Sequence, residues 1–465
     1  MTRPQHLTRP ALPRRTAVRP TPRWWRDACA AGACASLVAV VALWLAGRGA
    51  QQLAGGGGPA LSSAGRLSGL VSADLLLLQV LLMARLPVLE RSFGQDVLVR
   101  RHRLVGLWSF DLLLLHVVLI TLGYAAAARV GVLAEAWTLV VTYPGMLLAT
   151  AGTALLVLVV VTSVRAARRR LRYESWHLLH LYAYLGVALA LPHQLWTGSD
   201  FTGRPSATAY WWTAWGATAG CVLAFRLVLP AWRSWRHRLV VRDVVVEAPG
   251  VVSVHLTGRH LDRLPVRAGQ FFTWRFLDGP GWTHGNPYSL SAAPDGRSLR
   301  ITVRDTGRLA RLRPGTRALV EGPYGRLTAD VRVRTKVAVV ASGIGLTPGL
   351  ALLQELATGP LDAVVVHRAS TSQDALFEGE LAELTATAGV RVVPVVGRRV
   401  PGRASWLPAW AAHLDDGEAL RQLVPDLADR DVFVCGPPPW TEALLVAARA
   451  AGAPPEQVHV EHFTW

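Results

Sequence analysis

Long apolar stretches, separated by short polar loops, fill the first half of the chain. A helix needs about 20 residues, at a rise of about 1.5 Å each, to cross the hydrocarbon core of a bilayer. Six stretches are long enough, and the second is the most polar because it carries Asp74, Gln79 and Arg85. The pattern predicts six membrane-spanning helices, at residues 28–47, 67–89, 102–123, 143–164, 175–196 and 208–230.

From about residue 236 the pattern changes to short β-branched runs bounded by glycine and proline, which predict strands. Five of these runs favour a small antiparallel barrel: 239–246, 251–257, 271–277, 299–304 and 317–321. After residue 336, runs of strand length alternate with helical ones, which is typical of a parallel α/β sheet. The expected strands are Val337–Ala341, Ala363–His367, Val390–Val396, Asp431–Cys435 and Val458–Glu461, with helices near 348–358, 374–387 and 440–451.

Arginines carry almost all of the positive charge, and they cluster in alternate loops of the first half. The chain has 49 Lys and Arg against 31 Asp and Glu, a net charge of +18. Arginines are dense before the first span and after the second, fourth and sixth, but sparse at 51–65, 124–142 and 197–207. This alternation predicts a multi-pass protein of the plasma membrane with cytoplasmic N- and C-termini. It disfavours a nucleic-acid partner, because the basic residues follow the loops beside the lipid bilayer.

The N-terminal segment, residues 1–27, is rich in arginine and proline and is expected to be disordered. Its Arg14-Arg15 pair could instead belong to a secretory or twin-arginine signal. The apolar run starts well after that pair, and removing it would disturb the charge alternation, which favours a retained first span. The expected domains are a tail at 1–27, a helical domain at 28–232, a barrel at 236–332 and an α/β domain at 333–465.

Five of the 14 histidines fall within the third and fifth predicted spans. His102 and His116 are 14 residues apart, which places them within about 40° of one helix face and about 21 Å apart along the axis. His180 and His193 are 13 residues apart, a rise of about 20 Å. Intramembrane ionisable residues are usually functional, and imidazole is a common axial ligand of haem iron. The spacing favours two stacked haems over hydrogen bonds between helices.

The second histidine pair fits one helix face less well than the first. An ideal helix would separate His180 and His193 by about 140°. Pro192 directly precedes His193 and would kink the helix, which could re-aim that ring. On these grounds His177 competes with His180 as the ligand at the inner level.

The sequence around these histidines is similar to the membrane domain of the ferric reductase and NADPH oxidase family. The similar segments are Arg101-His102-Arg103-Leu104-Val105-Gly106 and Tyr173-Glu174-Ser175-Trp176-His177-Leu178-Leu179-His180-Leu181-Tyr182, continuing to His193. The resemblance implies six spans and two haems b held by histidine pairs. It favours His180 over His177. It also implies that His102 and His180 hold the cytoplasmic haem, and that His116 and His193 hold the outer one.

A second motif, Gly285-Asn286-Pro287-Tyr288-Ser289-Leu290-Ser291-Ala292-Ala293-Pro294, resembles the flavin motif of ferredoxin-reductase-like enzymes and of the oxidases. The family usually has Arg or His where this chain has Asn286, which weakens one expected contact. Glu321-Gly322-Pro323-Tyr324-Gly325 resembles the turn that closes the family's barrel. The resemblance implies an FAD site, and the alternative is an ordinary Pro-Tyr turn. The candidate FAD-binding residues are Asn286, Pro287, Tyr288, Ser289, Leu290, Ser291 and, for the pyrophosphate, Arg304.

A glycine turn, Ser342-Gly343-Ile344-Gly345-Leu346-Thr347-Pro348, follows the first strand of the α/β domain. Glycines allow close backbone approach, proline suits a first helical turn, and a helix N-terminus attracts phosphate. This form, with Val434-Cys435-Gly436-Pro437, resembles the nicotinamide half of the same reductases, whose cysteine lies beside the nicotinamide ring. The resemblance makes Gly343, Gly345, Thr347, Pro348, Gly436 and Pro437 candidate nucleotide-binding residues, with Cys435 as a candidate catalytic residue or, alternatively, a structural thiol.

Two further residues bear on the nucleotide and the flavin. Arg368 ends the second strand of the α/β sheet, where an arginine can accommodate a 2′-phosphate. This favours NADPH over NADH, although a solvated arginine is the alternative. Phe463 matches the family's Glu-x-Phe ending, which implies an aromatic cover for the flavin.

Taken together, these patterns predict a multidomain membrane protein. Its parts would be a six-helix all-α transmembrane haem domain, an antiparallel β-barrel FAD domain and an α/β parallel-sheet NAD(P)-binding domain. The resemblance implies an NAD(P)H-dependent oxidoreductase that passes electrons through FAD and two haems b to a small acceptor outside, a ferric chelate or dioxygen. The alternative is a membrane-anchored flavin reductase whose helices serve transport, quinone binding or anchoring without two haems. The oligomeric state stays open.

Overall fold

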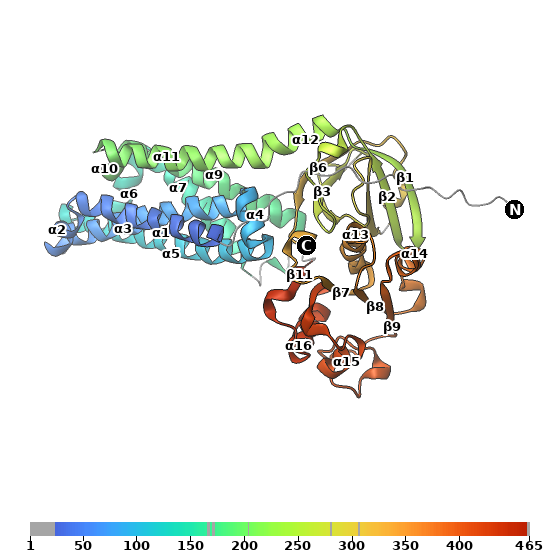
Figure 1. The fold of residues 1–465 in the computed structure, drawn as a ribbon. Coiled ribbons are helices and arrows are strands. Elements are labelled where there is room, and N and C mark those ends of the chain that lie inside the picture. Colours follow the sequence, from blue (N-terminus) through green and yellow to red (C-terminus); the bar gives the residue numbers. More distant parts are fainter. Residues whose placement is uncertain are drawn as a thin grey trace. The chain divides into compact units, whose positions relative to one another are not determined.

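The computed structural model describes residues 24–164, 168–169, 173–202, 204–279, 281–305 and 307–462. These residues form two compact units (Figure 1). One unit comprises residues 24–93 and 97–225, and the other comprises residues 94–96 and 226–462. The expected disordered tail lies outside the described residues up to residue 23, and Trp24 begins the first helix.

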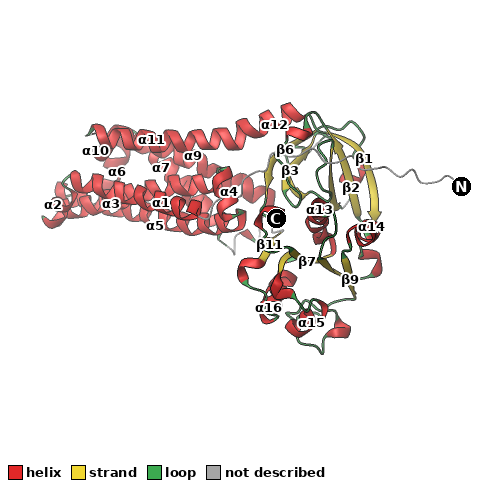
Figure 2. Ribbon diagram, in the orientation of Figure 1, coloured by secondary structure: helices red, strands yellow, loops and turns green. Residues whose placement is uncertain are grey.

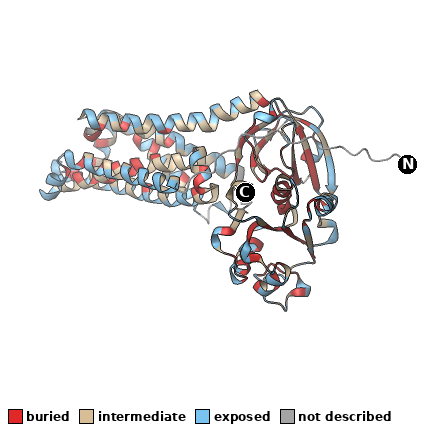
Figure 3. Ribbon diagram, viewed as in Figure 1, coloured by how far each residue is buried: buried red, intermediate tan, exposed pale blue. Residues whose placement is uncertain are grey.

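Six long helices dominate the first unit and confirm the six predicted spans: α1 (Trp24–Ala46), α3 (Gly57–Met83), α5 (Gln95–Ala128), α7 (Met146–Ser163), α9 (Tyr173–Thr197) and α11 (Pro205–Val222). All six are long and apolar enough to cross a membrane. Many of their residues are exposed (Figure 3), including large apolar ones such as Leu147, Val161 and Leu178. An apolar surface of this kind suits lipid rather than water.

The ends of the helices differ from the prediction in several places. Helix α3 ends at Met83 instead of continuing to 89, because Pro87 starts a separate short helix, α4 (Pro87–Phe93). Three more short helices lie in the loops: α2 (Gly49–Ala54), α6 (Val132–Thr142) and α10 (Ser199–Thr202). The apolar helix α6 was not predicted, since its 11 residues are too few to span a bilayer.

Small and polar residues hold the helices together. A Cβ atom on Gly152 of α7 would lie only 2.6 Å from the carbonyl oxygen of Gly186 in α9, so these helices approach closely because both positions are glycine. Asp74 of α3 is buried, and its Oδ1 accepts hydrogen bonds from Ser36 at 2.6 Å and Tyr210 at 2.9 Å. The most polar predicted span therefore faces its neighbours in α1 and α11.

Helix α11 continues through a π-helical turn, Leu223–Val228, into α12 (Leu229–His237). Helix α12 packs on the β-sheet domain that follows. Ser234 Oγ accepts from the backbone N–H of Val320 at 3.0 Å, and Arg226 pairs with Glu321 at 3.0 Å.

The first part of the second unit contains two three-stranded antiparallel sheets with the orders β1-β2-β5 and β4-β3-β6. The strands are β1 (Val240–Ala248), β2 (Val251–Thr257), β3 (Phe271–Phe276), β4 (Asn286–Ser289), β5 (Ser298–Arg304) and β6 (Ala318–Tyr324). Phe272, Trp274 and Ile301, which come from both sheets, share one core. Isolated bridges from Val240 to Arg317 and from Leu290 to Ile301 also connect the sheets. The five predicted strands are confirmed, and β4 was missed because it has four residues and includes a proline.

The second part is a five-stranded parallel sheet of order β11-β10-β7-β8-β9, covered by helices (Figure 2). The strands are β7 (Lys336–Ser342), β8 (Ala363–Ala369), β9 (Arg391–Val396), β10 (Arg430–Gly436) and β11 (Val458–His462). The helices are α13 (Leu346–Leu356), α14 (Glu378–Ala388), α15 (Asp416–Leu423) and α16 (Pro438–Ala450). The predicted α/β pattern is confirmed. The carboxyl ends of β7 and β10 bring both glycine motifs to one edge.

Helices α13 and α14 connect the two parts of this unit. Gln354 Oε1 accepts from the backbone N–H of Ala293 at 3.0 Å. The next residue, Glu355, accepts from the N–H of Ala268 at 2.8 Å. On α14, Glu380 forms a two-bond ion pair with Arg300 of β5, at 2.7 and 3.0 Å. These bonds fix the antiparallel sheets against the parallel sheet.

Candidate functional site

The helical unit brings one predicted histidine pair together. The imidazole rings of His102 on α5 and His180 on α9 have centroids 6.0 Å apart, at an interplanar angle of 72°. His177, three residues before His180, is exposed. The ring of His180 therefore lies beside that of His102, and its assignment as the ligand stays a prediction.

The Nδ1 atom of each of these two rings has a hydrogen-bond partner. His102 Nδ1 lies 3.1 Å from the carbonyl oxygen of Gln79 in α3. His180 Nδ1 lies 3.3 Å from the hydroxyl of Ser163 at the end of α7, and that hydroxyl also accepts from the indole N–H of Trp176 at 3.4 Å. Since a carbonyl only accepts, His102 carries its proton on Nδ1 and keeps a lone pair on Nε2.

The Nδ1 atoms of the other predicted pair, His116 and His193, also have hydrogen-bond partners. His116 Nδ1 lies 2.7 Å from the carbonyl oxygen of Gly65, and His193 Nδ1 lies 2.6 Å from that of Ala190. Pro192 lies inside α9, and the carbonyl that holds His193 comes from the same helical turn.

The Nδ1 contacts of these four rings are compatible with metal binding through Nε2. A metal-bound histidine commonly donates its other N–H to a carbonyl or similar acceptor, which orients the ring. Within the described part of the chain, Nε2 of all four rings makes no hydrogen bond. An imidazole nitrogen binds a metal at about 2 Å and its ring centre is about 1 Å further, so two rings on one iron have centres about 6 Å apart. The separation of His102 and His180 agrees with this value.

The predicted flavin motif forms β4 and the turn after it. Burial raises the pKa of the Tyr288 phenol to about 12, so the ring stays neutral. Ser289 is buried, and its Oγ has no hydrogen-bond partner among the described residues. A buried hydroxyl without a partner is costly, which fits a ligand that supplies the missing bond.

The remaining residues of that motif differ in their surroundings. Leu290 is fully buried in the core of the two sheets. Ser291 Oγ accepts from Thr302 at 2.7 Å and from Arg300 at 3.0 Å, so it stabilises the sheets. Asn286 and Pro287 are half-buried in β4, opposite Trp274 and Thr273 of β3.

Two arginines lie near the flavin motif. Arg304, the predicted pyrophosphate residue, is 62% exposed and pairs with Asp374 at 3.3 Å. Hydrogen bonding from Thr371, and secondarily from Arg304, lowers the pKa of Asp374. Arg308 pairs with Asp278 at 2.9 Å and interacts electrostatically with Tyr288. No sequence motif marks Arg308, which follows Gly307 a few residues after β5.

The glycine motif after β7 lies against the cysteine motif after β10. Gly343 has φ of +53°, a conformation that favours glycine. A Cβ on Gly345 would lie 2.4 Å from the carbonyl oxygen of Cys435, so only glycine allows the two motifs to touch. Thr347 Oγ1 donates to the carbonyl of Ile344 at 3.0 Å, and Pro348 is buried in the first turn of α13.

Cys435 lies at the end of β10, opposite Ala341 of β7, and is buried. Burial, and secondarily the charge of Glu461, raises the pKa of its thiol well above the ordinary value. The group is therefore a neutral thiol rather than a nucleophilic thiolate. Gly436 follows, and a Cβ there would collide with the ring of Trp440. Phe463 lies outside the described residues.

Arg368 is buried at the end of β8 and donates to backbone carbonyls. Its Nε bonds to Trp406 at 3.3 Å, and its Nη1 bonds to Val395 at 3.3 Å and to Ala369. Burial lowers the pKa of its guanidinium. These bonds join β8, β9 and the loop after β9, and only Nη2 is left without a partner in the described chain.

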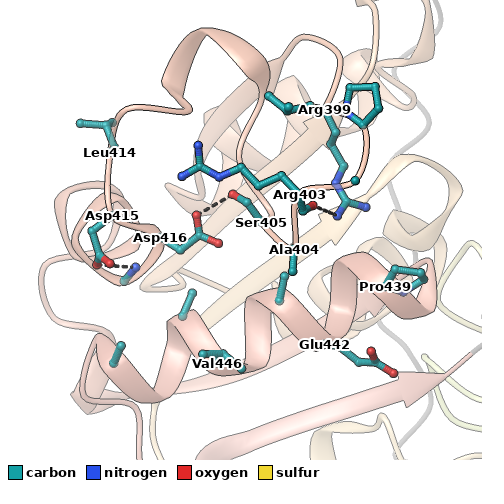
Figure 4. Close-up of a pocket in the computed structure, with 17 residues that line it drawn as sticks. Arg399, Arg403, Ala404, Ser405, Leu414, Asp415, Asp416, Pro439, Glu442 and Val446 are labelled. Atoms are coloured by element: carbon teal, nitrogen blue, oxygen red, sulfur yellow. Dashed lines mark hydrogen bonds between the residues drawn. The ribbon is translucent and has the colours of Figure 1, made fainter.

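A cavity of about 870 Å³ lies between the loop after β9 and helix α16 (Figure 4). Arg399 and Arg403 line it from the loop, and Pro439 and Glu442 line it from α16. Arg399 Nη2 donates to the carbonyl of Arg403 at 3.4 Å, while its buried Nε has no partner in the described chain. The run Arg398-Arg399, just after the end of β9, is the sequence signal that could have indicated this site.

Residues 68–191 match the family model of the ferric reductase like transmembrane component. The chain is also similar to the ferredoxin reductase component of 3-ketosteroid-9-alpha-monooxygenase from Mycolicibacterium smegmatis, with 31% identity over 240 residues, 48% of this chain and 65% of that protein. A flavohemoprotein from Rhizobium meliloti is 28% identical over 251 residues, 50% of this chain and 61% of that protein. The chain thus spans about three fifths of the length of these relatives.

Among solved structures, Amycolatopsis cytochrome P450 reductase GcoB is 23% identical, with 49% of this chain and 70% of that chain covered, at a TM-score of 0.42. The flavohem-like FAD/NAD binding domain of nitric oxide dioxygenase from Vibrio cholerae is 23% identical, with 49% and 98% covered, at 0.40. Residues 68–191 thus match the ferric reductase-like transmembrane family, and the part of the chain that follows is similar to reductases of the ferredoxin reductase type.

Proposed function

We propose that this protein is a transmembrane oxidoreductase that draws electrons from NAD(P)H and delivers them to a small acceptor across the membrane. When bound, FAD would take a hydride from NAD(P)H, and two haems would carry single electrons through the bilayer. The observation that carries the proposal is the pairing of His102 with His180 at 6.0 Å, with Nδ1 of each ring already hydrogen-bonded.

The four histidines would hold the haems by Nε2. His102 and His180 would bind one haem, and His116 and His193 the other, with lone pairs oriented by the bonds at Nδ1. With two histidines holding each haem, the acceptor would not need to bind the iron. The acceptor would therefore be reduced at the exposed edge of the site, which suits either a ferric chelate or dioxygen.

Tyr288 and Ser289 would hold the flavin. The neutral phenol ring of Tyr288 can stack on the isoalloxazine, and the buried hydroxyl of Ser289 lacks only the partner that a flavin would supply. Arg304 and Arg308 are the candidate cations for the FAD phosphates, with Asn286 as a neutral contact. Leu290 and Ser291 would act through the sheet core, which positions β4.

The nicotinamide nucleotide would lie along the carboxyl edge of the parallel sheet. The turn at Gly343 and Gly345 leads into the N-terminus of α13, which favours a pyrophosphate, and Cys435 with Gly436 would border the nicotinamide. Arg399 and Arg403 line the cavity and are better candidates than Arg368 to donate hydrogen bonds to a 2′-phosphate. Arg368 already donates to three backbone carbonyls. This favours NADPH over NADH.

The charge alternation supports cytoplasmic termini in a plasma membrane, with electrons moving outward. The test of the proposal is haem content in the purified full-length protein. We expect two low-spin haems per chain, both reduced by NADPH, and the loss of one haem in His116→Ala or His193→Ala. A wild-type protein with FAD but no haem would support the alternative of a membrane-anchored flavin reductase. Superoxide formation without iron would favour dioxygen as acceptor, and dependence on ferric citrate would favour ferric chelates.

A further inference from the structure

Helix α3 contacts α5 at points that share one antiparallel register. The carbonyl of Gly65 faces His116, and the carbonyl of Gln79 faces His102. Both pairs of residues are 14 apart along their own helices, a rise of about 21 Å. One helix therefore supplies the Nδ1 partner of both histidines on the neighbouring helix.

Two hydrogen bonds fix the register of α3 and α5 midway between the His116 and His102 contacts. Ser72 Oγ donates to the carbonyl of Ser109 at 2.6 Å, and Ser109 Oγ donates to the carbonyl of Ser72 at 3.0 Å. Both serines are buried. The three α3 positions 65, 72 and 79 are spaced by seven residues, as are 102, 109 and 116 on α5. A spacing of seven returns to nearly the same helix face, so the contacts form one seam.

Glycines let the two backbones approach along this seam. A Cβ on Gly69 would lie 2.5 Å from Nδ1 and 2.9 Å from Cε1 of His116, closer than real side chains come. Further along the seam, a Cβ on Gly58 would lie 2.9 Å from the carbonyl oxygen of Gly123, where no histidine is near. Gly69 thus differs from Gly58 in that the atom it makes room for belongs to an imidazole ring.

The histidines on α9 are held differently. His180 bonds to the hydroxyl of Ser163 on α7, and His193 bonds to a carbonyl of its own helix. A change in α3 therefore acts directly on His102 and His116 and leaves the Nδ1 bonds of the α9 rings intact.

We propose that α3 is the positioning element for both α5 ligands: its carbonyls at Gly65 and Gln79 direct the Nε2 atoms of His116 and His102, and Gly69 is the positioning residue of the His116 ring. The proposal rests on the proposed function, because it assigns the rings to iron. Gly69 would act through His116, because a Cβ at this position would meet that ring.

The test is Gly69→Ala in the full-length protein, with Gly58→Ala as the matched control on the same helix pair. We expect Gly69→Ala to weaken haem binding at the His116 level about 10–100-fold, as loss of ligand support does. Haem content should fall from two per chain towards one, or one low-spin ferric signal should become high-spin. Gly58→Ala should keep both low-spin signals, and FAD content should be unchanged in both variants.

Two low-spin haems in Gly69→Ala, with the wild-type spectrum, would overturn the proposal. A wild-type protein without haem would instead overturn the proposed function, so the two failures are distinguishable. If Gly69→Ala does not accumulate, the proposal is tested on the wild-type protein instead. Electron–nuclear double resonance then measures the protons of the imidazoles that bind the iron. Hydrogen-bonded Nδ1 protons that exchange slowly in deuterated water support the proposal, and freely exchanging ones overturn it.

Discussion

The hydroxyl of Ser163, the last residue of α7, lies 3.3 Å from Nδ1 of His180 and joins a fourth helix to the histidine pair. Ser163→Ala removes this partner without adding volume. We expect haem affinity at the His102 level to fall about 10–100-fold, because an unsupported axial ring is less well oriented. Haem titration of the purified protein measures this, with Thr150→Val of the same helix as the control. Equal affinity in both variants would show that Ser163 is not needed.

Ser289→Ala tests the flavin site. The buried Oγ lacks a partner in the described chain, so its removal should leave the stability of the flavin-free protein unchanged or slightly higher. FAD affinity should drop about 3–10-fold, which corresponds to one hydrogen bond of about 0.5–1.5 kcal/mol. Fluorescence titration with FAD gives the affinity. Ser298→Ala, at the start of β5, should bind FAD like the wild type, and an unaltered affinity in Ser289→Ala would remove this residue from the site.

The thiol of Cys435 should be unreactive in the folded protein. Its pKa is raised above the ordinary 9.0 by burial, so folding favours the neutral form. The unfolded thiol ionises near its ordinary pKa, and stability should therefore be unaffected below about pH 9 and decline as the pH rises further. Iodoacetamide labelling with mass spectrometry should modify Cys435 only after unfolding. Rapid labelling at pH 8 in the native protein would contradict the burial.

Arg399→Ala tests the nucleotide preference. Loss of a charge-assisted bond to a 2′-phosphate should raise the KM for NADPH about 10–100-fold and leave that for NADH unchanged. NAD(P)H oxidation with ferricyanide as acceptor measures both values. Arg391→Ala, at the opposite end of β9, is the control. Equal changes in the KM values for NADPH and NADH would contradict a contact with the 2′-phosphate. Arg399 would then support folding or contact a part that both nucleotides share.

Asp426 should make the α/β part sensitive to acid. Arg430 bonds to both of its oxygens, at 2.7 and 2.9 Å, and these bonds, with a smaller effect of Lys336, lower the pKa of the carboxyl to about 2. Because the folded pKa lies below the ordinary 3.8, this stabilisation is present above about pH 4 and is lost as the pH falls through 2. Asp426→Asn should lose about 1 kcal/mol at pH 7, since the group is partly exposed. Between pH 4 and 2, the free energy of unfolding of the variant should change less with pH than that of the wild type.

The sequence predicted the helices and most strands because long apolar runs and β-branched runs are local signals. It missed α6, which is too short for a span, and β4, where Pro287 interrupts the strand pattern. It also placed the end of the second span too late, because Pro87 starts a new helix instead of ending the old one.

The surroundings of a site residue were harder to predict where its hydrogen-bond partner lies far away in the sequence. The spacing of His102 and His116 was visible, but the carbonyls of α3 that orient them were not, since any residue type has a carbonyl. Arg368 lies at the strand end where an arginine often binds a nucleotide 2′-phosphate. However, the carbonyl of Trp406, 38 residues later, accepts a hydrogen bond from its Nε. Local sequence cannot show that burial.

The seam between α3 and α5 has a consequence for the proposed electron transfer. Tunnelling rates fall steeply with distance, so thermal motion of separate helices would make the transfer rate fluctuate. Here both α5 histidines, the proposed ligands, contact the same neighbouring helix at points 14 residues apart, and the hydrogen-bonded serine pair stabilises that register. The two-level spacing is therefore set by the rise of a helix, about 21 Å, which changes only if hydrogen bonds along the helix stretch. Helix α3 would therefore keep the tunnelling distance between the two histidine levels nearly constant.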